Sequence, residues 1–135
     1  MDTIFIVEDH PQIRRSYAAL IKRAPHLIVC GEAGSAEEAL VALLQVTPNL
    51  VLIDVSLPGM SGVELVSYLR HHQPHLATLV VSGHDEVAFI QGVLDAGAGG
   101  YVMKDHVPHC LIVAIEQVLA GRQYVSEPLP LCYNG

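Results

Sequence analysis

The 135-residue sequence has no tryptophan, and aromatic residues make up only 5% of it. Positive charge is also scarce, since 7 Lys and Arg stand against 14 Asp and Glu and the formal net charge is −7. A surface of this sign repels a phosphate backbone, so we expect no direct nucleic-acid binding by this chain. The three cysteines include no CxxC pair, and they therefore do not indicate a zinc site built from cysteine.

Long hydrophobic runs are absent as well, although 51% of the residues are hydrophobic. No uninterrupted apolar stretch approaches the roughly 20 residues that a membrane span requires. The first segment, MDTIFIVEDH, reaches acidic residues too early to be a signal peptide. The sequence therefore predicts a cytoplasmic chain that does not contact a membrane, and its length is that of one domain.

Short β-branched runs alternate with segments of helical periodicity along most of the chain, which is typical of βα units and a parallel sheet. The runs TIFIV, LVLI and TLVV are continuously apolar, so we expect their strands inside the sheet and helices on both of its faces. The expected class is α/β, with three layers. The predicted strands are residues 3–7, 27–31, 50–54, 78–82 and 100–103.

Five helices are predicted between and after these strands. Ser35 and Glu38 suggest a capping box at the start of the second helix, which is expected to bury Leu44 and to end before Pro48. The other four are expected at residues 11–23, 62–72, 86–96 and 109–120. After Gly121 the pattern is lost, so we expect a domain at residues 1–120 and a C-terminal tail or the start of a linker at residues 121–135.

Polar residues end or directly follow four of the predicted strands, at the edge where open parallel sheets bind ligands. Glu8 and Asp9 follow the first strand, Asp54 ends the third, Ser82 ends the fourth and Lys104 follows the fifth. Three carboxylates in one pocket repel each other unless a cation compensates, and oxygen ligands suit Mg²⁺. Each acid alone reads equally as a helix-capping residue, but the gathering of five such residues favours a site.

The segments IFIVEDHP, LVLIDVSLPGMSGVEL, LVVSGH and AGAGGYVMKD resemble the receiver domains of two-component response regulators. The segment AGAGGYVMKD and the later segment AIEQVLAGRQYVS are most similar to the branch that usually carries a C-terminal LuxR/NarL-type helix-turn-helix. The resemblance implies a flavodoxin-like, doubly wound, five-stranded parallel sheet in the order 2-1-3-4-5.

The resemblance also implies roles for the acidic residues. Asp54 would be the phosphoacceptor, taking the phosphoryl group of a sensor histidine kinase, a phosphotransfer protein or a small donor. The implied metal is Mg²⁺ or Mn²⁺. Asp9 would bind it directly and Glu8 mainly through water, and Asp54 and the backbone carbonyl of Ser56 would complete the ligand set.

The remaining roles concern the phosphate and the switch. Lys104 and Ser82 would each contact a phosphate oxygen, and Tyr101 would rotate inward as Ser82 shifts, remodelling the surface of the fourth helix, fifth strand and fifth helix. The alternative for Tyr101 is an ordinary half-exposed aromatic on an edge strand. Ser56 and His84 would flank the approach of water and tune the hydrolysis rate.

Two positions depart from the usual receiver pattern. Asp105 follows Lys104 where many receivers have a proline after a cis peptide bond, and the sequence leaves the isomer open. Glu8 replaces a common aspartate, which affects metal geometry more than metal binding.

The expected function is a signalling switch rather than an enzyme, catalysing only its own phosphorylation and slow dephosphorylation. Its output would be transcription through a domain outside this chain, and phosphorylation would strengthen a homodimer. The alternatives are a stand-alone receiver that acts by protein–protein interaction and a flavodoxin-like enzyme or nucleotide-binding domain. The last is disfavoured, because Ser56 stands where a haloacid-type phosphatase has an acid and EDHP stands where a glycine-rich loop is needed.

Overall fold

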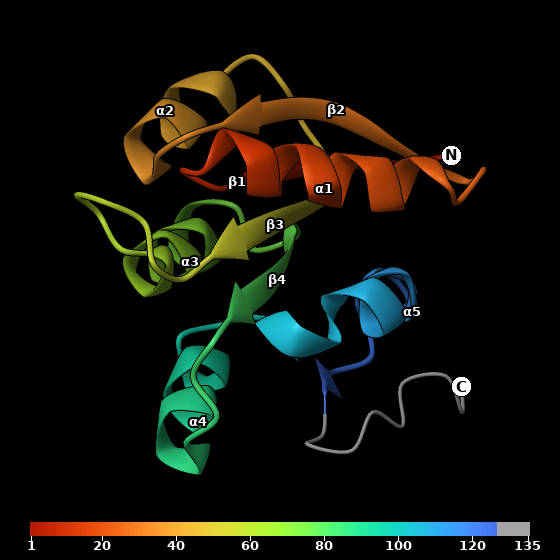
Figure 1. Ribbon diagram of the computed structural model, residues 1–135. Helices are drawn as coiled ribbons and strands as arrows, with labels where there is room; N and C mark the ends of the chain where they lie inside the picture. The colour runs from red at the N-terminus through yellow and green to blue at the C-terminus, as the bar shows by residue number, and fades with distance from the viewer. Residues whose placement is uncertain (127–135) are drawn as a thin grey trace.

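The computed structural model describes residues 1–126, which form a parallel sheet between two layers of helices (Figure 1). The strand order is β2-β1-β3-β4-β5-β6. The strands are β1 (Asp2–Val7), β2 (Leu27–Ala33), β3 (Leu50–Asp54), β4 (Ala77–Ser82), β5 (Gly100–Met103) and β6 (Tyr124–Val125). The helices are α1 (Pro11–Lys22), α2 (Ala36–Ala42), α3 (Gly62–His72), α4 (Val87–Asp95) and α5 (Val107–Leu119), with a short 3-10 turn η1 (Lys104–His106) before α5.

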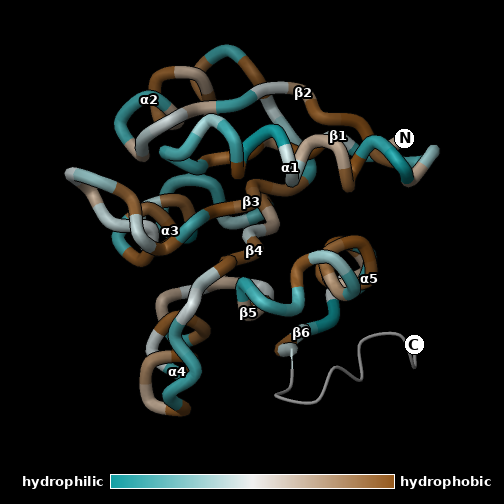
Figure 2. The backbone as a smooth tube through the Cα atoms, in the orientation of Figure 1, coloured by the Kyte–Doolittle hydropathy of each residue, from teal (hydrophilic) through white to brown (hydrophobic). Residues whose placement is uncertain are grey.

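The predicted fold class and the order 2-1-3-4-5 are confirmed, and the apolar strands β1, β3 and β4 lie inside the sheet. Successive side chains of a strand point to opposite faces, so each inner strand supplies two cores. Ile4 and Ile6 pack with α1 and α5, whereas Phe5 and Val7 pack on the face covered by α2, α3 and α4. In Figure 2, α1 alternates between hydrophilic and hydrophobic residues, as expected of a helix with one buried face.

The second helix differs from its prediction. It ends at Ala42, well before Pro48, and Leu44 is exposed rather than buried. The Ser35 hydroxyl does accept the Glu38 N–H at 3.1 Å, but the Glu38 carboxylate accepts the Gly34 N–H instead of closing the predicted capping box. A complete capping box lies instead at the start of α3, where none was predicted.

Strand β6 was not predicted and lies in the segment expected to be a tail. It pairs in parallel with β5, placing Gly100 opposite Tyr124 and Tyr101 opposite Val125. Strand β5 is therefore flanked on both sides, and Tyr101 is 0% exposed, which excludes the half-exposed edge position as an explanation of this residue. The domain boundary at residue 120 stays a prediction.

Two further features of the backbone bear on the expectations from sequence. Residues 1–126 contain no cis peptide bond, so the bond between Lys104 and Asp105 is trans. Over the same residues, no helix has the length and apolar character needed to cross a membrane.

Candidate functional site

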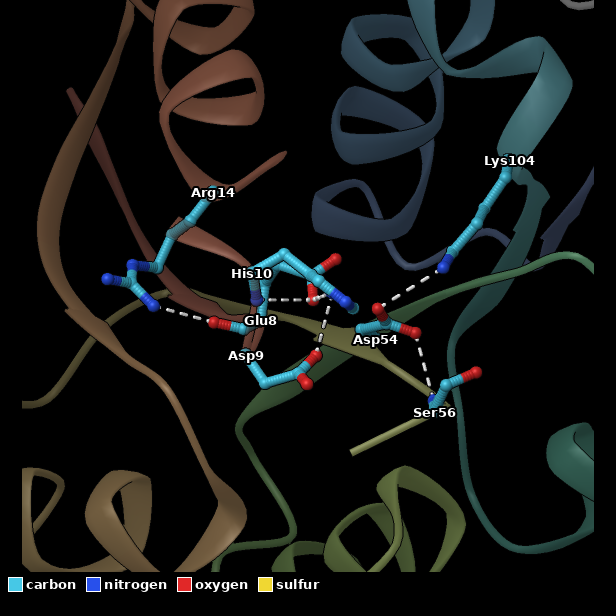
Figure 3. Close-up of polar contacts among 7 residues, drawn as sticks. All are labelled: Glu8, Asp9, His10, Arg14, Asp54, Ser56 and Lys104. Atoms are coloured by element: carbon cyan, nitrogen blue, oxygen red, sulfur yellow. Dashed lines mark hydrogen bonds and ion pairs between the residues drawn. The ribbon is translucent and has the colours of Figure 1, made fainter. Parts of the chain in front are cut away.

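Acidic side chains gather at the carboxyl edge of the sheet, where β1 and β3 end side by side (Figure 3). Glu8 and Asp9 follow β1, and Asp54 is the last residue of β3. Together with His10, these residues offer ligand atoms that all lie within 4.8 Å of one another. Glu8 is 0% and Asp54 1% exposed, whereas Asp9 is partly exposed and His10 is exposed, so the cluster is buried at the end of the sheet and open to solvent on one side.

The carboxylate cluster is electrostatically unbalanced. Burial raises the pKa of Glu8 to about 7, and the neighbouring carboxyls of Asp54 and Asp9 act in the same direction. Glu8 Oε1, Asp9 Oδ1 and Asp54 Oδ2 are buried and accept no hydrogen bond. Buried carboxylate oxygens that accept no hydrogen bond are costly, and a hard divalent cation would stabilise all three. The donor set therefore fits Mg²⁺.

Two residues at the start of α1 hold the β1 end of the cluster in place. The His10 N–H donates to Glu8 Oε2 at 3.2 Å, and His10 Nδ1 lies 3.1 Å from Asp9 Oδ1. Arg14 Nη1 donates to the Glu8 carbonyl oxygen at 2.7 Å, while its Nε donates to Glu32 Oε1 at 3.1 Å. Sequence patterns did not single out Arg14, because its contact is to a backbone oxygen and carries no residue-type signal.

Asp54 is contacted from two sides. The Ser56 N–H donates to Asp54 Oδ1 at 2.9 Å, and Lys104 Nζ lies 3.4 Å from Asp54 Oδ2 (Figure 3). Lys104 begins η1 directly after β5, so residues 50 positions apart in the sequence meet at this edge. One oxygen of the carboxylate is thus held by the backbone and the other faces an ammonium. The predicted use of the Ser56 carbonyl as a metal ligand stays a prediction.

The loop between Asp54 and α3 is fixed by close packing and by a carboxylate. A Cβ at Gly62 would lie 2.5 Å from the Asp54 carbonyl oxygen, so this position requires glycine. Glu37 of α2 accepts the Met60 N–H at 3.0 Å, and this hydrogen bond lowers the pKa of Glu37. The loop that follows the candidate acceptor is therefore positioned by α2 as well as by α3. No sequence pattern pointed to this role of Glu37.

Ser82 and Tyr101 meet at one backbone turn. Ser82, at the end of β4, is buried, and its Oγ accepts the His84 N–H at 3.1 Å. The Tyr101 hydroxyl donates to the His84 carbonyl oxygen at 2.6 Å, and burial raises the pKa of Tyr101. The His84 ring lies against Phe89 of α4, with 4.4 Å between ring centroids. The two residues expected to switch are thus joined through His84, with Tyr101 in its inward position.

The model of the response regulator receiver domain family matches residues 4–116. The transcriptional activator protein ExaE of Pseudomonas putida is 40% identical over 126 residues, covering 93% of this chain and 59% of ExaE. The nitrate/nitrite response regulator protein NarL of Escherichia coli K12 is 36% identical over 129 residues, covering 94% of this chain and 59% of NarL.

A solved structure agrees with these relatives. The crystal structure of a two-component response regulator of the LuxR family from Aurantimonas sp. SI85-9A1 is 38% identical and superposes with a TM-score of 0.88. The similarity covers 92% of this chain and 89% of that one. The chain spans 59% of the length of the two curated relatives, so those similarities concern one region of each.

Proposed function

This chain belongs to the response regulator receiver domain family, and on that premise we propose that it is a phosphorylation switch with Asp54 as the phosphoacceptor. The observation that carries the proposal is the position of the Asp54 carboxylate. It is buried at the end of β3, with Lys104 Nζ 3.4 Å from one oxygen. Glu8 Oε1 and Asp9 Oδ1, which accept no hydrogen bond, lie beside it. This arrangement presents a carboxylate nucleophile to an incoming anion.

The proposed reaction is phosphoryl transfer from a phosphohistidine. A carboxylate oxygen of Asp54 forms a bond to phosphorus, the bond from phosphorus to the imidazole nitrogen breaks, and the donor imidazole leaves and takes up a proton. Lys104 pairs with one phosphoryl oxygen and the Ser82 hydroxyl donates to another. The Ser56 N–H, which already holds Asp54 Oδ1, keeps the carboxylate oriented during attack.

The residues proposed to hold the metal are Glu8, Asp9, Asp54 and the backbone carbonyl of Ser56. Bound there, Mg²⁺ or Mn²⁺ would supply positive charge that stabilises the transferring phosphoryl oxygens. Without it, the three carboxylates would repel a phosphoryl group. Arg14 and His10 contribute by holding Glu8 where its free oxygen faces Asp9 and Asp54.

Switching is proposed to run through His84. When Ser82 turns toward the phosphoryl group, its Oγ leaves the His84 N–H. The carbonyl oxygen of His84 accepts the Tyr101 hydroxyl, so this movement is passed to Tyr101. The surface formed by α4, β5 and α5 then changes. The bulk of Ser56 and His84 is proposed to set how readily water reaches the phosphate, and thus the rate of dephosphorylation. The chain is proposed to catalyse only its own phosphorylation and slow dephosphorylation.

The partners follow from this chemistry. The proposed donor is a sensor histidine kinase or a phosphotransfer protein in the cytoplasm, and phosphorylation is proposed to strengthen a homodimer. Two of the relatives are a transcriptional activator and a nitrate/nitrite response regulator, so we propose transcription as the output, through a region beyond this chain.

The acceptor is tested by Asp54→Asn with acetyl phosphate as the donor. We expect the unsubstituted chain to gain the mass of one phosphoryl group in Mg²⁺ buffer and Asp54→Asn to gain none. Asp85→Asn is the matched control, because Asp85 is an exposed acid at the same edge of the sheet. Persistent labelling of Asp54→Asn would place the acceptor elsewhere.

A further inference from the structure

The residue that follows β6 is hydrogen-bonded to the strand that leads into the site. The Ser126 N–H donates to the Tyr101 carbonyl oxygen at 2.9 Å, and the Met103 N–H donates to Ser126 Oγ at 2.8 Å. Ser126 is only 5% exposed. A single buried serine therefore bonds β5 on both sides of Val102, from a segment 23 residues further along the chain.

The backbone that Ser126 holds carries two groups used in the proposed switch. Tyr101 projects from it toward His84, and Lys104 follows Met103 directly. On its other side, Met103 is paired with Ser82 of β4. The end of β5 thus lies between Ser82 and Ser126, and Ser126 is connected to Asp54 through Met103 and the Lys104 ammonium.

The close approach of β6 to β5 depends on a glycine. A Cβ at Gly100 would lie 2.9 Å from the Tyr124 carbonyl oxygen and 2.9 Å from Val118 Cγ2 of α5. Any side chain there would push β6 or α5 away from the sheet. The packing of β6 against β5 therefore requires glycine at position 100, and the hydrogen bonds of Ser126 hold the chain in this position.

We propose that Ser126 is a positioning residue of the phosphoacceptor site. It holds the end of β5 so that Lys104 and Tyr101 are correctly placed, and it thereby links occupancy of the site to the chain that continues after β6. The inference rests on the proposed function. Such coupling between two sites is reciprocal. If the hydrogen bond between Met103 and Ser126 strengthens ligand binding at Asp54, then ligand binding at Asp54 must also strengthen that hydrogen bond.

The first test measures the affinity of the 135-residue chain for beryllofluoride in Mg²⁺ buffer, by fluorine NMR. We expect Ser126→Ala, which loses the bond to Met103, to bind beryllofluoride more weakly by up to about fivefold, the limit set by the free energy of one net hydrogen bond. Ser126→Thr keeps the hydroxyl and is expected to restore affinity. The matched control is Tyr124→Phe, which removes a β6 hydroxyl that is buried without a hydrogen-bond partner and should leave affinity unchanged.

The second test needs no variant and does not depend on how well Ser126→Ala folds. Amide hydrogen exchange of Met103 and Ser126 is measured by NMR with and without beryllofluoride. We expect exchange at both amides to slow severalfold when beryllofluoride binds. Unchanged exchange at both amides, or equal affinity of Ser126→Ala and the unsubstituted chain, overturns the positioning role. An unsubstituted chain that binds no beryllofluoride instead overturns the proposed function.

Discussion

Replacing Glu8 by glutamine is expected to stabilise the metal-free protein, and to do so more strongly as the pH rises. Burial, followed by the neighbouring carboxyls of Asp54 and Asp9, raises the pKa of Glu8 from 4.5 to about 7 in the folded state. An unfolded chain exposes Glu8 to water and restores the lower pKa. The folded protein must therefore either bind a proton at Glu8 or bury a third negative charge, whereas a neutral glutamine side chain at this position would do neither.

The sign and size of the effect follow from the two pKa values. Between pH 4.5 and about 7 the folded state binds more protons at Glu8 than the unfolded state, so the free energy of unfolding falls as the pH rises through this window. The full loss amounts to roughly 3 kcal/mol, from about 1.4 kcal/mol for each pH unit between the two values. Above pH 7 the loss is complete, and below pH 4.5 it is absent.

The measurement is urea unfolding of both chains in EDTA from pH 4.5 to pH 8, followed by far-ultraviolet circular dichroism. The difference in unfolding free energy between the two chains reports the loss of the Glu8 charge together with its contacts to His10, Asp9 and Asp54. Glu37→Gln is the control of opposite sign: its pKa is lowered in the folded state, so its stabilising contribution is lost as the pH falls. A Glu8→Gln difference that stays flat across this range would refute the reasoning.

Three further predictions concern the same edge of the sheet. Asp9→Ala is expected to weaken Mg²⁺ binding roughly tenfold, measured by titration calorimetry, because it removes one of the three buried carboxylate oxygens that accept no hydrogen bond. Unchanged affinity would remove Asp9 from the ligand set. Gly62→Ala is expected to lower the free energy of unfolding in urea by roughly 1–3 kcal/mol and to slow phosphorylation of Asp54, because its Cβ would clash with the Asp54 carbonyl oxygen. Unchanged stability would show that the loop can move to accept the side chain. His84→Ala is expected to shorten the lifetime of the phosphorylated chain about fivefold, on the order of 1 kcal/mol in barrier height, by removing a half-exposed ring two residues after Ser82. A longer lifetime of the His84→Ala phosphate would favour His84 as a general base instead.

The order of the layers and the position of the acidic edge were predictable from the sequence, because both depend on hydrophobic periodicity. Continuously apolar strands such as residues 50–54 require cover on two faces, and parallel strands covered in this way bring their carboxyl ends to one edge. Asp9 and Asp54, 45 positions apart, therefore had to lie near each other once the strands were recognised.

The hydrogen bonds that complete the site were decided only by the tertiary structure. Strand β6 has two residues, too few to show any period, and its pairing depends on an open edge of β5 and on the space that Gly100 leaves. The Glu38 carboxylate accepts the Gly34 N–H instead of the predicted one, Arg14 donates to the carbonyl oxygen of Glu8, and Ser126 accepts the N–H of Met103. Polar side chains bond to the backbone N–H and C=O groups that the helices and strands leave unpaired. These groups are known only once every strand and helix has its neighbours.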